Sequence, residues 1–225
     1  MPARTTPLVT GQFYHIFNRG VNKQPIFLNR KDYARALSVF EFYSFVDIPI
    51  RFSKFLLLSL EERFKILKDL RKRSLKYVDF ISYCFMPNHF HFLVKQNRDN
   101  GISKFMGDFQ NSYTKYFNTK HERIGPILQG QFKAVFVEDE NQLLHLSRYI
   151  HLNPFTSFVV KDLTDLDTYP WSSFPEYLGN SSIELCHKQI VMANFKAKEL
   201  YKSFVFDQAD YQRELDKIKH IAIER

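Results

Sequence analysis

Two adjacent segments, residues 78–86 and 89–96, constrain the fold of this 225-residue chain more than any other feature. The second segment begins with histidine and phenylalanine in alternation, His-Phe-His-Phe at 89–92, and such alternation is typical of a β-strand. The first segment is rich in the apolar and aromatic residues that strands prefer. Only the turn-forming pair Pro87 and Asn88 separates the two segments. We therefore predict two antiparallel strands joined as a hairpin.

The second of these strands carries two histidines, His89 and His91. The alternation places both on one side of the strand together with Leu93, and it places the phenylalanines on the other side. A neutral imidazole is the commonest protein ligand for a transition metal, and two positions two residues apart can reach one ion. An isolated pair of this kind is also typical of the solvent face of a strand, so the pair alone does not establish a metal site.

A helix is expected over residues 140–153. Asp139 and Gln142 fit a capping box at its start, and Pro154 predicts its end, because the residue before a proline is pushed out of helical geometry. The apolar stripe of this helix consists of Leu143, Leu146 and Ile150. It is expected to pack toward the core.

His145, Tyr149 and Asn153 lie four residues apart on a neighbouring face of the same helix. A tyrosine hydroxyl is a poor nucleophile at its reference pKa of about 10. It therefore needs a base nearby, or a metal that activates its target. His145 can be a base, a metal ligand or a surface residue on this pattern.

Three motifs carry a resemblance to a known family: Tyr-His-Ile-Phe-Asn-Arg-Gly at 14–20, Met-Pro-Asn-His-Phe-His at 86–91, and Tyr-Ile-His-Leu-Asn-Pro at 149–154. Further support comes from Gly125, from Gln-Gly-Gln-Phe at 129–132 and from Trp-Ser-Ser at 171–173. In this order the motifs resemble those of the one-tyrosine HUH transposases, most closely the branch of REP-associated tyrosine transposases. The resemblance runs from about residue 13 to about residue 179.

The resemblance implies a metal-dependent DNA endonuclease and strand transferase. His89, His91 and Asn153 would bind one divalent ion, Mg²⁺ or Mn²⁺, and Tyr149 would be the catalytic nucleophile. The tyrosine would attack a phosphodiester of single-stranded DNA beside a hairpin, leaving a 5′-phosphotyrosine and a free 3′-hydroxyl. The covalent intermediate would keep the energy of the phosphodiester, so no ATP is implied.

Three residues are expected to contact DNA: Asn18, Arg19 and Lys133. Gly20 after the first strand lets the backbone approach a ligand, and an arginine beside it can grip phosphate. A second basic run, at residues 68–76, ends a predicted helix, where cations are favoured in any case, so we interpret it as a solvated face.

The order of elements predicts an α+β fold. Strands are expected at 12–18, 78–86, 89–96 and 131–138, and helices at 32–44, 103–118 and 140–153. This order fits a ferredoxin-like or RRM-like antiparallel four-stranded sheet with helices on one face. Residues 46–76 are expected to form a helical insertion, with a capped helix from Ser59 to Arg73. We predict a catalytic domain at 1–179 and a helical extension at 180–225.

Composition agrees with a nucleic-acid partner. The formal net charge is +8 and the sequence pI is about 9.3, which favours attraction to phosphate. The two cysteines lack metal spacing and are too few for a disulfide scaffold, which favours a reducing compartment. The N-terminus has no apolar leader, and no run of about 20 apolar residues suggests a membrane span. We therefore expect a cytoplasmic protein.

Several alternatives stay open at this stage. The chain could be a noncatalytic RRM-like binder of single-stranded nucleic acid, or a zinc hydrolase that uses the two histidines and a third one. Tyr113 and Tyr116 compete with Tyr149 for the role of nucleophile, while His15 and His151 are interpreted as structural residues. The active form could be a monomer or a dimer that exchanges tyrosine helices.

Overall fold

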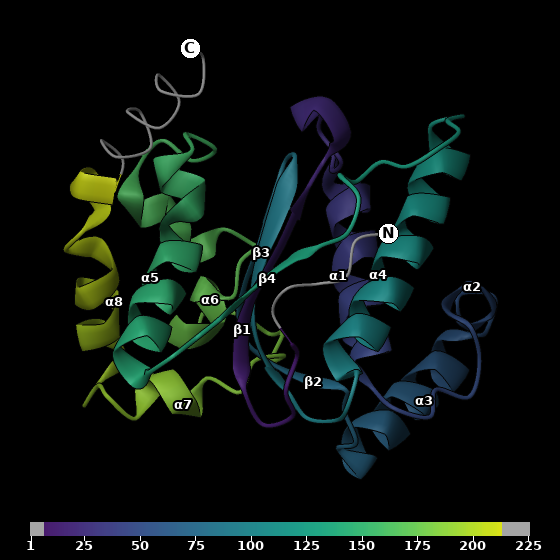
Figure 1. Cartoon of the computed structure of the whole chain (residues 1–225), viewed down its shortest axis with the longest axis horizontal. Coiled ribbons are helices and arrows are strands. Elements are labelled where there is room, and N and C mark those ends of the chain that lie inside the picture. The colour runs from purple at the N-terminus through teal and green to yellow at the C-terminus, as the bar shows by residue number, and fades with distance from the viewer. Residues whose placement is uncertain (1–6, 213–225) are drawn as a thin grey trace.

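The computed structural model describes residues 7–212, and within them four strands form one antiparallel sheet in the order β2-β3-β1-β4. The strands are β1 (Phe13–Arg19), β2 (Val78–Met86), β3 (His89–Gln96) and β4 (Lys133–Phe136). The larger helices are α1 (Arg30–Ser44), α3 (Leu60–Arg73), α4 (Gly101–Lys120), α5 (Glu140–Thr156) and α8 (Lys198–Phe206). Shorter elements are η1 (Val21–Lys23), α2 (Phe52–Phe55), η2 (Leu163–Thr168), α6 (Phe174–Leu178) and α7 (Gln189–Met192). The succession β1-α1-β2-β3-α4-β4 in this strand order is ferredoxin-like, so the predicted fold class is confirmed (Figure 1).

The hairpin of β2 and β3 forms as predicted, with the same bounds. Met86 pairs with His89 and Cys84 with His91, and the ladder is regular except for a bulge between Phe80 and Ser82. Strand β1 pairs with the other edge of β3, so that Phe17 lies opposite His91. The histidine strand is therefore central in the sheet.

One face of the sheet packs on α1 and α4 through a core of aromatic side chains (Figure 1). Phe90 and Phe92 of β3 point into this core, as the alternation predicts, and Phe40 of α1 stacks on Phe80 at 3.7 Å between ring centroids. Burying each such ring contributes roughly 1.5–3 kcal/mol. This layer makes a rigid base under the strand that carries the histidines.

Helices cover the opposite face as well, so the expectation of helices on one face only is incomplete. Helices α5, α6 and α8 lie on this second side of the sheet (Figure 1). The physical reason is that the alternate positions of β2 and β3 are also apolar there: Ile81, Cys84, Met86 and Leu93 are completely buried. Apolar surface on both faces requires a second layer of helices.

The helix α5 begins as predicted and ends later. Asp139 accepts a hydrogen bond from the Gln142 backbone N–H, while the Gln142 side chain accepts from the N–H of Glu138 and not from that of Asp139. Pro154 lies inside the helix, which continues to Thr156, so the predicted stop is wrong. The last turn persists because Phe155 is buried in the second core, which outweighs the one backbone bond that proline removes.

The insertion and the C-terminal extension are helical where they are described. Ser59 and Glu62 form the predicted capping box of α3, and Arg71 of this helix forms an ion pair with Glu41 of α1. Helices α7 and α8 of the extension pack against α5 in the second core, whereas Leu185 belongs to the first core. The division at 179 and 180 stays a prediction, and residues 213–225 of the expected helical tail lie outside the described residues.

Candidate active site

The site lies on the sheet face that α5 covers, where β1 and β3 run side by side. His89 and His91 of β3 lie on this face, with 5.0 Å between their ring centroids. His15 of β1 joins them, because its ring stacks on His91 at 5.0 Å and its Nε2 lies 2.9 Å from Nδ1 of His91. The structure thus brings together three imidazoles, of which the sequence pattern predicted two.

Tyr149 of α5 lies directly over these rings. Its ring is edge-on to His91 at 5.5 Å between centroids and edge-on to His15 at 6.2 Å. The convergence of Tyr149 with the predicted metal-binding pair is therefore a feature of the fold, while the chemical roles of these residues stay predictions.

The two inner histidines are neutral at physiological pH. His91 is buried, and its pKa lies well below the ordinary value because of burial and the nearby charges of His89 and His15. Burial also lowers the pKa of His15 to about 4. A neutral imidazole keeps one nitrogen lone pair, which is what a metal ion requires.

Asn153, the predicted third ligand, is buried one turn after Tyr149. Its Nδ2 donates a hydrogen bond to the backbone carbonyl of Tyr149 at 3.2 Å. This bond uses the nitrogen of the amide, so Oδ1 is the atom that could bind a cation. Within residues 7–212 no group of three or more His, Cys, Asp and Glu side chains is arranged to hold a metal ion. A metal site here stays a prediction, and Asn153 stays its predicted third ligand.

The other two histidines of α5 have structural partners. His145 is exposed, and Arg148 donates a hydrogen bond to its Nδ1 at 2.6 Å. His151 is completely buried between the hydroxyls of Tyr201 and Ser173, each 2.7 Å from a ring nitrogen, and burial lowers its pKa to about 3. The structural interpretation of His151 is thus confirmed, whereas His15 belongs to the site.

The register of β1 explains why His15 was missed. On its own strand His15 is one polar residue among alternating aromatic ones, and nothing local assigns it to a face of the sheet. Pairing with β3 places Phe17 opposite His91 and Leu93 opposite His15, which puts all of them on the α5 face. One feature of the sequence could have assigned His15 to the site: strand alternation puts His15 and Phe17 on the same face as Arg19, a predicted DNA contact.

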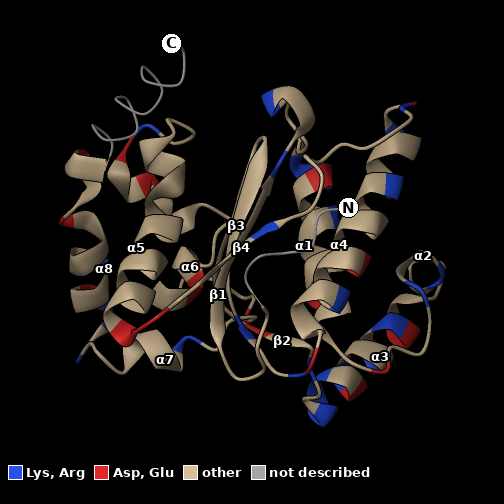
Figure 2. Ribbon diagram, in the orientation of Figure 1, with Lys and Arg blue, Asp and Glu red and all other residues tan. Residues whose placement is uncertain are grey.

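The three predicted DNA-contacting residues differ in position. Arg19 and Lys133 are exposed; Arg19 lies opposite His89 in the sheet, and Lys133 lies opposite Phe17 with its Nζ 5.9 Å from that ring. Asn18 is buried, and its side chain bonds to the Arg19 N–H and to the Gly130 carbonyl. Figure 2 shows basic positions on β1, β4 and η1 beside the site, and further ones on α3 and α4 away from it.

The competing tyrosines lie in the α1 and α4 layer, on the other side of the sheet. The Tyr113 hydroxyl is buried and donates to the carbonyl of Ile26, and the Tyr116 hydroxyl donates to Asp32. Burial raises the pKa of both phenols. Neither contacts the histidine pair, so Tyr149 is the tyrosine that the fold presents to the site.

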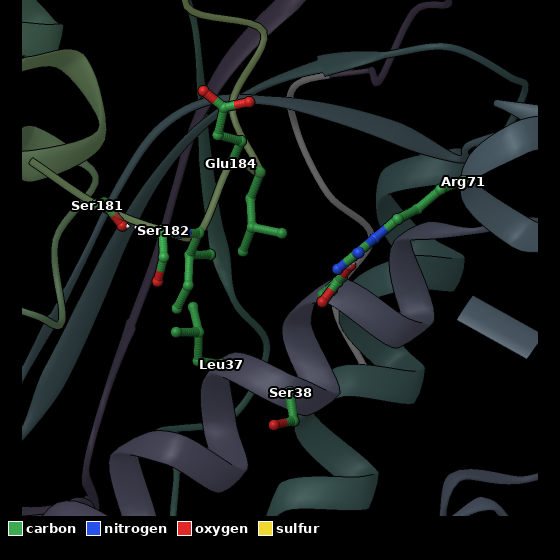
Figure 3. A pocket seen from close by; sticks show the side chains of 9 residues that line it. Leu37, Ser38, Arg71, Ser181, Ser182 and Glu184 are labelled. Atoms are coloured by element: carbon green, nitrogen blue, oxygen red, sulfur yellow. Dashed lines mark hydrogen bonds and ion pairs between the residues drawn. The ribbon is translucent and has the colours of Figure 1, made fainter. Parts of the chain in front are cut away.

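A pocket of about 500 Å³ lies elsewhere, between α1, the end of α3 and residues 181–185 (Figure 3). Its rim includes the ion pair of Glu41 and Arg71. None of its lining residues belongs to the histidine site.

A histidine pair on the central strand of a ferredoxin-like sheet, facing a tyrosine on a packed helix, is the arrangement that the resemblance to one-tyrosine transposases predicts. Residues 54–153 match the family model of IS200-like transposases. This segment carries His89, His91, Tyr149 and Asn153, and it is similar to that family.

One solved structure, a REP-associated tyrosine transposase bound to a REP hairpin, is similar to this chain with a TM-score of 0.52. The two are 14% identical, and the similarity covers 82% of this chain and 90% of the other. At this identity the likeness establishes the shared fold. No curated protein matches the chain.

Proposed function

We propose that this protein is a metal-dependent single-stranded DNA endonuclease and strand transferase that cuts beside hairpins through Tyr149. The observation that carries the proposal is the edge-on contact of Tyr149 with His91 at 5.5 Å, on a surface next to exposed basic residues. The similar solved structure, with its bound REP hairpin, supports hairpin DNA as the substrate. Transposition, or a cellular process that uses the same chemistry, is the corresponding activity.

The residues present fit a divalent metal. His91 is neutral, His89 lies beside it, and an amide oxygen from Asn153 would complete a mixed nitrogen and oxygen set. Such ligands suit Mn²⁺, and Mg²⁺ takes oxygen ligands and keeps several of its waters. When bound, the ion would act as a Lewis acid that polarises the scissile phosphate.

The reaction needs one bond made and one broken at phosphorus. The Tyr149 oxygen loses its proton and bonds to phosphorus, and the bond to O3′ breaks as that oxygen takes up a proton. The product is a 5′-phosphotyrosine with a free 3′-hydroxyl. Attack by a 3′-hydroxyl reverses the step, so cutting and joining require no ATP. The packing of α5 on the sheet fixes the position of the nucleophile, which supplies the orientation on which such a step depends.

The noncatalytic RRM-like alternative would use an open sheet face on which bases stack. Here α5 covers β2 and β3 on the face opposite α1 and α4. Cys84 and Cys186 are free thiols, which fits the reducing compartment that we propose. No helix among residues 7–212 has the length and apolar character of a membrane span.

The decisive experiment is formation of a covalent adduct. Wild-type protein incubated with Mn²⁺ and a hairpin that carries a single-stranded flank should give a protein–DNA band on a denaturing gel. Tyr149→Phe should bind the same DNA and form no adduct, and chelation of the metal should abolish the adduct of the wild type. Tyr211→Phe, which changes an exposed tyrosine outside the site, is the matched control.

An adduct formed by Tyr149→Phe and lost in Tyr116→Phe would show that the nucleophile is misassigned. Binding of the hairpin by wild-type protein without any adduct would favour the noncatalytic alternative.

A further inference from the structure

The metal chemistry proposed above depends on where the protons of the histidine pair lie. A neutral imidazole carries one N–H and one lone pair, and only the nitrogen with the lone pair can bind a cation. In metal sites the other nitrogen usually donates to an oxygen or another acceptor, which fixes the ring and its tautomer. The neighbours of His89 and His91 therefore decide whether the pair can bind.

Asn88 decides the question for His89. The Nδ2 of Asn88 donates to the backbone carbonyl of Lys23 at 3.0 Å, and a carbonyl can only accept. The amide orientation is thereby fixed, and Oδ1 of Asn88 is the atom that lies 2.6 Å from Nδ1 of His89. Because an amide oxygen cannot donate, Nδ1 of His89 must carry a proton, and in the neutral ring Nε2 then carries the lone pair.

His15 contacts Nδ1 of His91, as Asn88 contacts Nδ1 of His89. Its Nε2 lies 2.9 Å from Nδ1 of His91, and one proton is shared between these two nitrogens. If His91 donates, its Nε2 has the lone pair that a cation needs. If His15 donates instead, Nε2 of His91 carries a proton and cannot bind. His15 can accept through Nε2 when its own proton lies on Nδ1, and the contact between the two rings then fixes the tautomer of His91.

We infer that Asn88 and His15 are positioning residues that hold His89 and His91 in the Nδ1–H tautomer, so that Nε2 of each ring is the nitrogen that binds the divalent ion. The inference rests on the proposed function. It gives a chemical role to the asparagine before the histidine pair and to a histidine on a different strand.

The loop that holds Asn88 is built for this contact. The Gly20 N–H donates to the Asn88 carbonyl at 2.7 Å, and a side chain at Gly20 would place its Cβ 2.1 Å from the carbonyl oxygen of Gln24. Asn22 and Lys23 both adopt positive φ, which is uncommon for residues other than glycine. This strained turn directs the Lys23 carbonyl at Asn88, so the motif after β1 acts on the histidines of β3.

The test is the tautomer of each histidine in the metal-free protein, read by two-bond ¹H–¹⁵N correlation spectra at about pH 8. The wild type should show the Nδ1–H form for His89 and His91. Asn88→Asp retains an acceptor and should preserve that form at His89, whereas Asn88→Ala should release it to a mixture with the Nε2–H form. His15→Phe, which keeps a ring without an acceptor, should do the same at His91.

Mn²⁺ titration supplies an independent readout. Asn88→Ala and His15→Phe should each weaken Mn²⁺ binding by about 10- to 100-fold, and Asn88→Asp should stay within a few-fold of the wild type. Asn194→Ala, at a remote asparagine that bonds Glu140, is the matched control and should bind as the wild type does. A thermal melt of each variant establishes that it is folded.

An Nε2–H form of His89 or His91 in the wild-type protein overturns the inference, whether or not any variant folds. So does normal Mn²⁺ binding by folded Asn88→Ala and His15→Phe. Wild-type protein with the inferred tautomers that neither binds Mn²⁺ nor forms an adduct overturns the proposed function and leaves the proton assignment standing.

Discussion

Asp32 is a completely buried carboxylate at the start of α1 that ties three segments together. It accepts hydrogen bonds from Lys120 at 2.5 Å, from the Tyr116 hydroxyl at 2.9 Å and from the Leu28 N–H at 3.0 Å. Burial opposes ionisation, but the bonds from Lys120, Leu28 and Tyr116 outweigh it and lower the pKa of Asp32 below 3.8. These bonds stabilise the charged carboxylate more than the protonated acid.

Asp32→Asn should therefore destabilise the protein by about 1.5–3 kcal/mol at neutral pH, the range for hydrogen bonds to a charged group. Because the pKa is lower in the folded state, this contribution is fully present above the ordinary value of 3.8 and is lost as the pH falls through the folded pKa. Urea unfolding at neutral pH and below pH 3.8 should show the difference from the wild type shrinking in acid.

Asp108→Asn is the control, because its ion pair with Lys104 is partly exposed to solvent and is worth about 1 kcal/mol or less. Equal effects of the two substitutions at neutral pH would contradict the assignment of a special role to Asp32.

At the scale of elements, a buried series of side-chain hydrogen bonds holds the tyrosine helix α5 in position, in addition to apolar packing. His151 of α5 bonds to Ser173 before α6 and to Tyr201 of α8, whose hydroxyl also lies 3.2 Å from Ser147. Ser173 in turn accepts from the Tyr83 N–H of β2. The chain of bonds thus links α5 to the C-terminal helix and to the sheet, which fixes the height of Tyr149 over the histidines.

Tyr201→Phe should loosen α5 without touching the site. The substitution leaves a nitrogen of buried His151 unsatisfied, which costs about 1–3 kcal/mol of unfolding free energy. Hydrogen exchange should quicken along α5 and α8, and adduct formation should slow while hairpin binding is retained. Tyr211→Phe, at an exposed position, should shift stability by no more than about 0.5 kcal/mol. Unchanged exchange along α5 in Tyr201→Phe would show that packing alone positions the helix.

At the scale of the whole molecule, positive charge is distributed unevenly around the site. Arg19 and Lys133 are exposed on the strands beside the histidines, whereas α5 carries one basic residue, Arg148, which is buried against Phe204. Figure 2 shows this contrast between the strands and the tyrosine helix. A DNA backbone that approaches from the strand side would meet basic side chains. A phosphodiester bond of that DNA placed at the histidines would then face Tyr149.

Removal of either exposed charge should weaken DNA binding at all sequences. Arg19→Ala and Lys133→Ala should each reduce the dependence of log affinity on log salt concentration by about one unit, because each phosphate contact releases about one counterion. Binding of a flanked hairpin, measured by fluorescence anisotropy over about 50 to 200 mM salt, tests this. Lys54→Ala, at an exposed position of α2 in the other layer, should leave the salt dependence unchanged. A similar change in the salt dependence of all three variants would show that the DNA does not bind specifically beside Arg19 and Lys133.

The rate of cutting should also depend on whether the DNA strand is paired. A hairpin with a single-stranded flank should be cut faster than the same sequence as full duplex, since an unpaired strand can bring its phosphate into line with the Tyr149 oxygen. Adduct assays should compare the flanked hairpin, the duplex and an RNA copy. Equal cutting of duplex, or preference for RNA, would contradict single-stranded DNA as the substrate.

The sequence by itself determined the features that depend on near neighbours. Alternation and the Pro87-Asn88 turn predicted the bounds of β2 and β3, and Ser59 and Glu62 predicted the start of α3, because hairpins and caps are formed by residues a few positions apart. The positions of His89, His91 and Tyr149 on their faces followed from the periods of strand and helix. Net charge and the order of the motifs likewise indicated a nucleic-acid partner, since neither depends on how the chain folds.

Only the tertiary structure decided which side chains from distant segments of the chain are neighbours. Pairing of β1 with β3 brought His15 against His91, and the turn after β1 brought the Lys23 carbonyl to Asn88, although about 65 to 76 residues separate the partners. The second helical layer, and the survival of α5 past Pro154, arose because buried apolar surface outweighed a local rule. Local periodicity sets the face on which a side chain lies, but register and packing between distant segments set its neighbours, and the chemistry of this site depends on neighbours.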